Sequence, residues 1–200
     1  GGATHLDALQ LDDGSEMACD GVVLALPPDR LEKVIGSPQT LGLPELSAFR
    51  TAPIIDVHLW YDVPAFGFGF AALLGSPVQW VFEKAPGYLC CSMSAAGEYI
   101  GMPGAQLVEL CHRELAAVLP QLRGREPRRG AATRDREATF IPSPGLQRPG
   151  NQTACRQVVI AGSWTDTGWP ATMESAVRSG RRAAHLLSAA LTVSPEVPVG

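Results

Sequence analysis

Residues 161–180, AGSWTDTGWPATMESAVRSG, place two tryptophans, several glycines and a proline directly before a helical pattern. The apolar run at residues 158–161 predicts a strand, and Gly162 allows tight backbone passage or a positive φ where that strand ends. Pro170 suits the first turn of a helix, where its missing N–H costs nothing. A strand, a glycine-containing loop and a helix N-terminus together present free N–H groups and the positive end of a helix dipole. This order predicts a receptor for an anion or for a negatively polarised group.

The pattern leaves three interpretations of this segment open. The ligand could be a phosphate, or it could be the negatively polarised N1–C2=O edge of a reduced flavin. The third interpretation is structural: the loop only joins strand to helix, and Trp164 and Trp169 anchor the core. The helix itself is predicted to run from residue 173 to about residue 191, and its apolar stripe is predicted to comprise Met173, Val177, Gly180, Ala184 and Leu187.

The bulk composition indicates a globular protein with a substantial core. The chain has 200 residues, of which 46% are hydrophobic and 18% charged, with a net charge of −4. An acidic balance argues against general nucleic-acid binding, which needs a basic face. No stretch is long and apolar enough to suggest a secretory signal or a membrane span, so we expect a cytoplasmic protein.

Cysteine and histidine spacing predicts no metal site. The cysteines number five and form no C-x-x-C pair, and the four histidines are scattered. We expect buried thiols in a reducing compartment, with Cys90 and Cys91 on opposite faces of one strand.

The N-terminal part predicts a strand-rich start. Residues 5–10 and a turn at residues 12–15 lead to a hairpin whose second arm is a buried strand at residues 22–26. An apolar strand without alternation is typical of a parallel sheet. Asp29 is expected to cap a short helix over residues 30–35.

The middle of the chain predicts an antiparallel sheet and a helix. Four strand-like runs, at residues 54–61, 68–74, 78–83 and 88–94, are separated by proline or glycine. A helix follows over residues 106–122, and a further strand over residues 131–141. The apolar face of this helix is predicted to comprise Leu107, Val108, Cys111, Leu115, Val118 and Leu122.

The first and last pieces are therefore expected to form one layered α/β domain, with the middle inserted between them. The chain contains no G-x-G-x-x-G turn, which a complete dinucleotide-binding fold needs. We place residues 1–45 and 151–191 in the α/β domain, residues 46–150 in the inserted domain, and residues 192–200 in a frayed tail.

The segment VVIAGSWTDTGWPATMESAVRSGRRAA resembles the C-terminal flavin signature of the flavin amine oxidase/phytoene desaturase superfamily. Its W-P-A-T-M-E stretch is most similar to the squalene-associated branch, the hydroxysqualene dehydroxylases. Further similar stretches are DGVVLALPP, APIIDVHLWYD, QWVFEK and EATFIPSPGLQRPGNQT. The resemblance implies an α/β (α+β overall) fold: a partial Rossmann-like FAD-binding domain and a substrate domain built on a mixed or antiparallel sheet plus a helix.

The resemblance also implies FAD as cofactor and a set of residues that hold it. Gly162 and Ser163 match the pair that approaches the ribityl chain, and Thr172 and Met173 match the helix start that meets the pyrimidine edge. The remaining predicted contacts are Trp169 and Pro170 at the ring edge, and Ala25, Leu26 and Pro27 at a strand end near the cofactor.

Two departures from the family pattern bear on this cofactor site. Ser163 stands where the family has aspartate, so a charge-assisted hydrogen bond becomes a neutral one. The N-terminal third of the family, with its diphosphate-binding glycines and ribose-binding acid, has no counterpart in the sequence. We therefore expect an N-terminally truncated chain that needs a separate FAD-binding half.

The implied activity is reductive removal of the hydroxyl of hydroxysqualene, a long-chain isoprenoid, to give squalene. The alternatives are a carotenoid desaturase-like or amine oxidase-like flavoenzyme, and a non-catalytic fragment that cannot bind FAD alone. No acid or base is assigned, because Asp56, His58 and Glu83 in the substrate sheet are expected to be surface or strand-end residues. The basic segment from Arg123 to Arg129 is either a solvated loop or a peripheral contact with anionic headgroups on the inner face of a membrane.

Overall fold

The computed structural model describes residues 5–192 and divides the chain into two compact units. The discontinuous unit comprises residues 1–49 and 142–200, and the inserted unit comprises residues 50–141. The two boundaries lie at the start of strand β4 (Thr51–Trp60) and at the end of strand β8 (Arg129–Phe140), which pair with each other. The sequence placed them at residues 45/46 and 150/151, because its proline- and glycine-rich stretches mark connections and not the pairing of strands.

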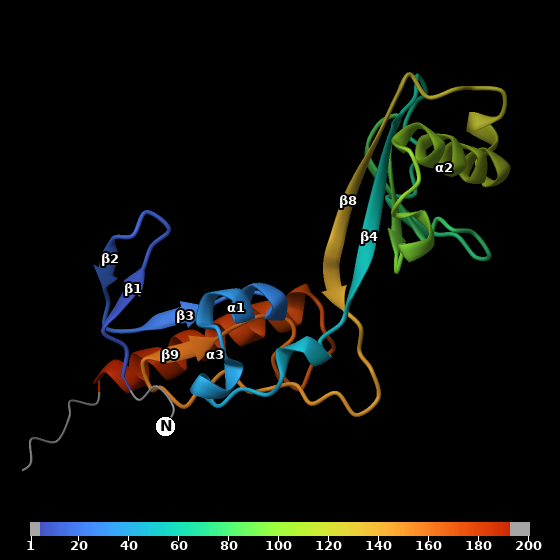
Figure 1. Cartoon of the computed structure of the whole chain (residues 1–200). Coiled ribbons are helices and arrows are strands. Elements are labelled where there is room, and N and C mark those ends of the chain that lie inside the picture. Colours follow the sequence, from blue (N-terminus) through green and yellow to red (C-terminus); the bar gives the residue numbers. More distant parts are fainter. Residues whose placement is uncertain (1–4, 193–200) are drawn as a thin grey trace, which may run out of the picture. The chain divides into compact units, whose positions relative to one another are not determined.

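The inserted unit is a five-stranded antiparallel sheet with one helix on it (Figure 1). The strand order is β5-β6-β7-β4-β8, where β5 is Phe70–Ala72, β6 is Trp80–Ala85 and β7 is Tyr88–Ser94. Helix α2 (Gly104–Val118) is followed by a 3-10 turn at Pro120–Leu122. All strand pairs in this sheet are antiparallel, which confirms the predicted antiparallel sheet plus helix.

Strand alternation decides which face of this sheet is covered. Ile55, Val57 and Leu59 of β4 are fully buried and share one core cluster with Leu107 and Leu115 of α2. The intervening side chains of β4 lie on the opposite face, as period-two alternation requires. The predicted apolar face of α2 is therefore confirmed, apart from Val118, which is more than half exposed at the end of the helix.

The spacing G-x-G-x-x-A at residues 67–72 is a variant of the dinucleotide-binding turn, and the structure shows that it serves no such role. It leads into β5 of the antiparallel sheet and opens no helix.

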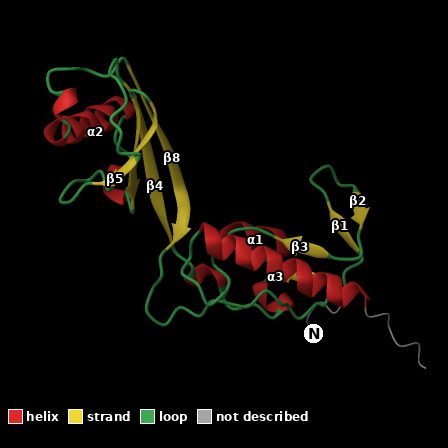
Figure 2. Ribbon diagram, turned by 180° about the vertical axis from the view of Figure 1, so that it is seen from behind, coloured by secondary structure: helices red, strands yellow, loops and turns green. Residues whose placement is uncertain are grey.

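The discontinuous unit is built on two small sheets and two helices (Figure 2). Strands β1 (Ala8–Gln10) and β2 (Glu16–Ala18) form a hairpin, while β3 (Val22–Leu24) pairs in parallel with β9 (Val158–Ile160). Helix α1 (Pro28–Ile35) follows β3, helix α3 (Met173–Thr192) follows β9, and short 3-10 turns lie at Pro38–Leu41 and Leu46–Ala48. The parallel pairing of the apolar run is thus confirmed, but the second arm of the hairpin is β2 and not that run.

Two predictions about helix α1 and the chain end need correction. Helix α1 begins at Pro28, after Pro27 as its N-cap, and no side chain caps it. Asp29 is therefore inside the first turn, where its charge suits the helix dipole, and is not the cap. Of the predicted tail, Thr192 belongs to α3, and residues 193–200 lie outside the described residues.

The buried face of α3 differs from the predicted apolar stripe, although Leu187 of that stripe packs against the buried cluster of Val159, Ala161 and Ala183. The helix buries Ser175, Ser179 and Ala183, whereas Met173 is 89% and Val177 56% exposed. Small residues let the helix lie close to the sheet, and the two buried hydroxyls find hydrogen-bond partners beneath it. Hydrogen bonding, which a hydrophobic pattern does not register, therefore decides the orientation of α3.

The thiols behave as the sequence predicts for four of the five cysteines. Cys90, Cys91, Cys111 and Cys155 are buried and unpaired, while Cys19 is half-buried. A hydrogen bond with Cys111, and burial, raise the pKa of the Cys91 thiol, so it stays protonated and inert. Within residues 5–192 no group of histidine, cysteine and acidic side chains could hold a metal ion.

No helix among the described residues is long and apolar enough to cross a bilayer.

Candidate functional site

The carboxyl ends of the parallel strands β3 and β9 meet at one edge of the discontinuous unit. The N–H of Ala161 donates to the carbonyl of Leu24 at 3.1 Å, and the indole Nε1 of Trp164 donates to the carbonyl of Leu26 at 2.9 Å. These bonds bring the two predicted groups together, residues 25–27 after β3 and Gly162 after β9. Ligands of open α/β sheets bind at the carboxyl ends of the strands, which is where these residues lie.

The ring of Trp164 lies so close to position 162 that only glycine fits there. A Cβ built on Gly162 would lie 2.6 Å from Cδ1 and Nε1 of the Trp164 ring, and the Gly162 φ of +154° is one that other residues rarely adopt. The Gly162 N–H is already used, because it donates to Oγ of Ser179 at 3.0 Å. Trp164 is buried and packs edge-to-face on Phe49, with ring centroids 5.5 Å apart, so it is a core anchor.

A buried polar cluster fixes the loop to α3 from below. The side chains of Asn151, Thr165 and Ser179 are almost completely buried. Asn151 Nδ2 donates to the carbonyl of Ile160 at 2.8 Å and to Oγ of Ser179 at 2.8 Å. The hydroxyls of Thr165 and Ser179 lie 2.7 Å apart. The polar pairing of these groups holds β9, the loop and α3 in one arrangement.

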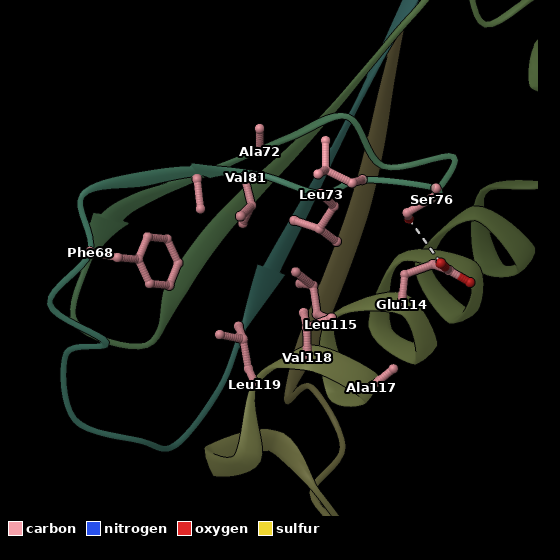
Figure 3. A pocket seen from close by; sticks show the side chains of 13 residues that line it. Phe68, Ala72, Leu73, Ser76, Val81, Glu114, Leu115, Ala117, Val118 and Leu119 are labelled. Atoms are coloured by element: carbon pink, nitrogen blue, oxygen red, sulfur yellow. Dashed lines mark hydrogen bonds between the residues drawn. The ribbon is translucent and has the colours of Figure 1, made fainter.

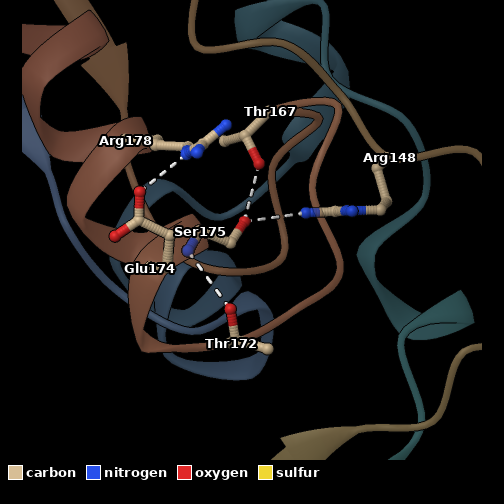
Figure 4. A network of polar contacts seen from close by, with 6 residues as sticks. All are labelled: Arg148, Thr167, Thr172, Glu174, Ser175 and Arg178. Atoms are coloured by element: carbon tan, nitrogen blue, oxygen red, sulfur yellow. Dashed lines mark hydrogen bonds and ion pairs between the residues drawn. The ribbon is translucent and has the colours of Figure 1, made fainter.

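Arg148 holds the same loop from its other side (Figure 4). Its guanidinium donates to the backbone carbonyls of Ser163 at 2.7 Å, Trp164 at 3.3 Å and Trp169 at 2.7 Å, and also to that of Thr165. A further bond reaches Oγ of Ser175 at 3.2 Å. One side chain therefore binds both ends of the loop over residues 163–169.

The start of α3 leaves backbone donors without acceptors. Helix α3 begins at Met173, so Pro170 precedes the helix. The prediction that Pro170 lies in its first turn was wrong. Thr172 bonds to the following turn: its Oγ1 accepts from Ser175 N at 3.4 Å and its carbonyl from Ala176 N at 3.1 Å. Among the described residues, no acceptor meets the N–H of Met173 or of Glu174. Helix N-termini with open N–H groups attract negatively polarised ligands.

The side chains around this helix start are open to solvent. Trp169 is 43% exposed, Pro170 and Thr172 are exposed, and Ser163 is half-buried. The guanidinium of Arg178 lies over one face of the Trp169 ring, 4.2 Å from the ring centroid. Arg178 in turn pairs with Glu174, with Nε and Oε1 2.8 Å apart. Ala25 and Pro27 are exposed, and Leu26 is half-buried. The predicted residues therefore form a surface that the described residues of the discontinuous unit leave uncovered.

Sequence reasoning missed the residues that hold this surface in place. Arg148, Asn151 and Ser179 were not assigned a role, although Arg148 and Asn151 lie within the stretch EATFIPSPGLQRPGNQT that carried part of the resemblance. The available signal was an arginine between two Pro-Gly dipeptides and an asparagine directly after the second, in a segment otherwise poor in charge.

The inserted unit has two further surfaces, and the first is an aromatic face. Opposite α2, the aromatic face comprises His58, Trp60, Phe70, Trp80, Phe82 and Tyr88. The Trp60 and Tyr88 rings stack with centroids 4.7 Å apart, and the guanidinium of Arg129 covers Trp60 at 4.9 Å. His58 Nδ1 lies 2.9 Å from the Tyr88 hydroxyl. Both faces of the Trp60 ring are thus already occupied.

The second surface is a pocket of about 380 Å³ beside the C-terminal half of α2 (Figure 3). Phe68, Leu73, Val81 and Leu115 are among the apolar residues that line it. Its polar feature is a hydrogen bond of 2.8 Å from the Ser76 hydroxyl to the Glu114 carboxylate. The pocket therefore suits an apolar group.

Two polar side chains of the inserted unit, Glu83 and Tyr61, have structural partners. Glu83 accepts from the N–H groups of Phe66 and Gly67, at 2.5 and 2.7 Å. Burial raises the pKa of Tyr61, whose hydroxyl lies 3.0 Å from Nδ1 of His112. These groups supply no evident acid or base.

The fold is similar to that of a solved structure. A protein of Exiguobacterium sp. 255-15 assigned as a protoporphyrinogen oxidase superposes with a TM-score of 0.64 at 14% identity, over 90% of this chain and 43% of that chain. The sequence profile described as flavin containing amine oxidoreductase matches residues 4–188. The chain belongs to this flavin containing amine oxidoreductase family, and membership implies an FAD cofactor.

Two curated relatives are similar to this chain. The hydroxysqualene dehydroxylase of Rhodopseudomonas palustris is 34% identical over 179 residues, which is 86% of this chain and 39% of that protein. The zeta-carotene desaturase of Arabidopsis thaliana is 26% identical over 116 residues, covering 57% of this chain and 21% of that protein. The chain thus spans about two fifths of the length of the dehydroxylase.

The residues of the candidate site fit one edge of the implied FAD. The open N–H groups of Met173 and Glu174, the dipole of a 20-residue helix and the charge of Arg148 suit a group that accepts hydrogen bonds and carries negative charge. The Ser163 hydroxyl, which has no partner among the described residues, suits a sugar-like hydroxyl. The fit covers this edge alone, since no diphosphate-binding turn lies in the chain.

Proposed function

We propose that this chain is the C-terminal part of an FAD-dependent oxidoreductase of isoprenoid metabolism, which removes the hydroxyl of hydroxysqualene reductively to give squalene. The observation that carries the proposal is the loop over residues 162–173, whose open donors at the start of α3 suit the negatively polarised edge of a flavin. The substrate is inferred from the relative named hydroxysqualene dehydroxylase.

FAD, when bound and reduced, would supply the hydride that replaces the hydroxyl, and a proton from the reduced flavin or from solvent would let the hydroxyl leave as water. The part of this chain is to bind and orient. The N–H groups of Met173 and Glu174 would hold the electron-rich edge, Ser163 would bond the ribityl chain, and Trp169 would limit the ring on its free side. The full set proposed to hold FAD is Ala25, Leu26, Pro27, Gly162, Ser163, Trp169, Pro170, Thr172 and Met173.

The inserted unit supports an apolar substrate better than an amine. A cationic amine binds over an aromatic ring, and at Trp60 it would meet the Tyr88 ring and the like charge of Arg129. Lys84 likewise covers Phe82, with its Nζ 5.1 Å from the ring centroid. The apolar pocket near Leu115 and the exposed Phe70 of the aromatic face suit a hydrocarbon chain.

The test of this function is product analysis with the flavin-loaded protein. Incubation with hydroxysqualene and a reductant is expected to give squalene, identified by mass spectrometry. Loss of hydrogen from a polyene substrate, without dehydroxylation, would favour the second candidate, a carotenoid desaturase, which the similarity to zeta-carotene desaturase supports. Neither product from a protein that holds FAD would contradict both.

We further propose that the diphosphate-binding glycines and the ribose-binding acid come from a dinucleotide-binding half that lies outside these 200 residues. The absence of a G-x-G-x-x-G turn from the chain and its coverage of 39% of the dehydroxylase support this. Without that half, the chain would be the non-catalytic fragment that the sequence leaves open.

Ser163→Asp is expected to tighten FAD binding. An ionised acceptor makes a stronger hydrogen bond to a ribityl hydroxyl than a neutral hydroxyl does, by roughly 1 kcal/mol, or about fivefold in Kd. The measurement is a fluorescence titration with FAD of the chain assembled with its dinucleotide-binding half. Ser163→Ala serves as the control and should bind no more tightly than the parent chain, and equal affinity of all three would contradict this position for Ser163.

We also propose peripheral contact with anionic lipid on the inner face of a membrane, through the arginines at positions 123, 125, 128 and 129. Two of them have intramolecular partners: Arg128 pairs with Asp62, and Arg129 covers Trp60. Arg123 and Arg125 are therefore the two arginines that we expect to bind the lipid headgroups. Flotation with anionic vesicles should show salt-sensitive binding that falls in the Arg123→Gln/Arg125→Gln variant, whereas equal flotation of variant and parent would rule out this contact.

A further inference from the structure

Arg148 bonds four backbone carbonyls of the loop over residues 163–169, and the carbonyl of Ser163 also accepts from the Ser175 hydroxyl at 3.4 Å. A guanidinium has five N–H donors in a rigid planar fork. In Arg148 they meet the carbonyls of residues 163, 164, 165 and 169 and the hydroxyl of Ser175. These acceptors come from the loop on which Ser163 and Trp169 lie and from the first turn of α3 (Figure 4).

The direction of these carbonyls determines the direction of the amide groups. In a trans peptide the C=O and the N–H of the next residue point to opposite sides. Because the Ser163 carbonyl points to Arg148, the N–H of Trp164 points away from it, and among the described residues no acceptor meets that N–H. The pull of Arg148 on the carbonyls therefore turns a donor of the loop outward.

Arg148 also brings a positive charge that no carboxylate of the described residues pairs with. The acidic groups on the same elements have other partners. Glu174 pairs with Arg178 at 2.8 Å, and Asp166 accepts from the N–H of Gly168 at 3.0 Å. The charge adds to the positive end of the α3 dipole near the open N–H groups.

We propose that Arg148 is the positioning residue of the cofactor loop: it fixes residues 163–169 so that the open N–H of Trp164 faces FAD, and its charge favours the reduced, more negative form of the flavin. This inference rests on the proposed function, because it requires that FAD binds beside the loop. The set of residues proposed above to hold FAD does not include Arg148, and this inference adds its role.

Two substitutions of Arg148 distinguish the effect of its hydrogen bonds from the effect of its charge. Arg148→Met removes both the hydrogen bonds and the charge, whereas Arg148→Lys keeps the charge but cannot span both ends of the loop. The matched control is Arg156→Met, which removes an arginine of the same unit whose Nη2 donates to one helix carbonyl, that of Ala190, at 3.0 Å. All variants are compared in the flavin-loaded assembly, for the Kd of FAD and its midpoint potential.

We expect Arg148→Met to weaken FAD binding at least tenfold and to lower the midpoint potential. If the charge favours the reduced form tenfold, the fall is about 30 mV for a two-electron couple. Arg148→Lys should lose affinity similarly but keep a potential close to that of the parent. Hydrogen exchange of the amides over residues 163–169 should become faster in both variants. If Arg148→Met does not fold, the affinity and exchange of Arg148→Lys decide the positioning role.

The outcomes distinguish this inference from the proposed function. If the parent assembly binds no FAD, the proposed function is overturned, and this inference with it. If the parent binds FAD and the Arg148 variants match Arg156→Met in affinity and potential, the inference is overturned and the proposed function stands. If Arg148→Lys shows the low potential of Arg148→Met, the electrostatic role is overturned.

Discussion

Gly162→Ala is expected to lower the free energy of unfolding of the discontinuous unit by about 3 kcal/mol and to abolish FAD binding. The new Cβ would overlap the Trp164 ring at 2.6 Å. Either the ring moves and breaks its bond to the Leu26 carbonyl, or the backbone moves and breaks the bond to Ser179. The first movement separates the loop from the end of β3, and the second separates it from α3. Urea unfolding followed by circular dichroism measures the loss.

Gly168→Ala is the matched control for this prediction. Gly168 lies in the same loop with a φ of +68°, and no atom lies within 4 Å of a Cβ built on it. Its substitution should cost only the backbone strain of a left-handed residue, about 1 kcal/mol. Equal losses in the two variants would show that the Trp164 contact is not what requires glycine at position 162.

Asn151→Leu is the second substitution with a large expected effect. The variant has a side chain of similar shape but no donor, so the buried carbonyl of Ile160 loses the Asn151 donor. The hydroxyl of Ser179 loses one partner and keeps its bonds to Gly162 and Thr165. An unsatisfied buried group costs about 1–3 kcal/mol and a lost hydrogen bond about 1 kcal/mol, which gives an expected loss of about 3 kcal/mol. The same unfolding measurement applies.

Gln152→Leu provides the comparison, because Gln152 is exposed and adjacent in sequence. Its effect should stay within about 0.5 kcal/mol, as for most surface substitutions. If Asn151→Leu were as stable as Gln152→Leu, the buried polar cluster would not be what holds α3 against β9.

The inserted unit was predictable because its elements are local. Proline and glycine bound each strand, and the alternation of Ile55, Val57 and Leu59 selects the face that packs on α2. The helix pattern of Leu107, Cys111 and Leu115 then matches that face. Short-range patterns were therefore sufficient for the sheet and its helix.

The discontinuous unit was less predictable because hydrogen bonds between distant residues determine it. Ser179 is buried because Asn151 and Gly162, far from it in sequence, bond to its hydroxyl. Hydrophobic periodicity ranks Met173 and Val177 above a serine, so it selected the wrong face of α3. The role of Arg148 likewise depends on carbonyls 15 or more positions away, and no local pattern reports them.

The candidate site itself was predicted as a location, and its residues remain a proposal. The sequence order of strand, glycine loop and helix placed it after residue 160, and the structure adds the contact of Trp164 with Leu26 that joins both halves. The motif did not predict the residues that hold the loop in place, Arg148, Asn151 and Ser179, because none of them belongs to a recognisable catalytic or binding pattern.

The most direct test of this account is an FAD titration of the purified chain, alone and co-expressed with a dinucleotide-binding half that carries a G-x-G-x-x-G turn. Flavin absorbance and fluorescence report the bound cofactor. The account predicts stoichiometric FAD in the co-expressed assembly, with Gly168→Ala retaining it and Gly162→Ala losing it. A colourless assembly that takes up no FAD, although both parts are folded and associated, would contradict the central claim that residues 162–173 hold a flavin.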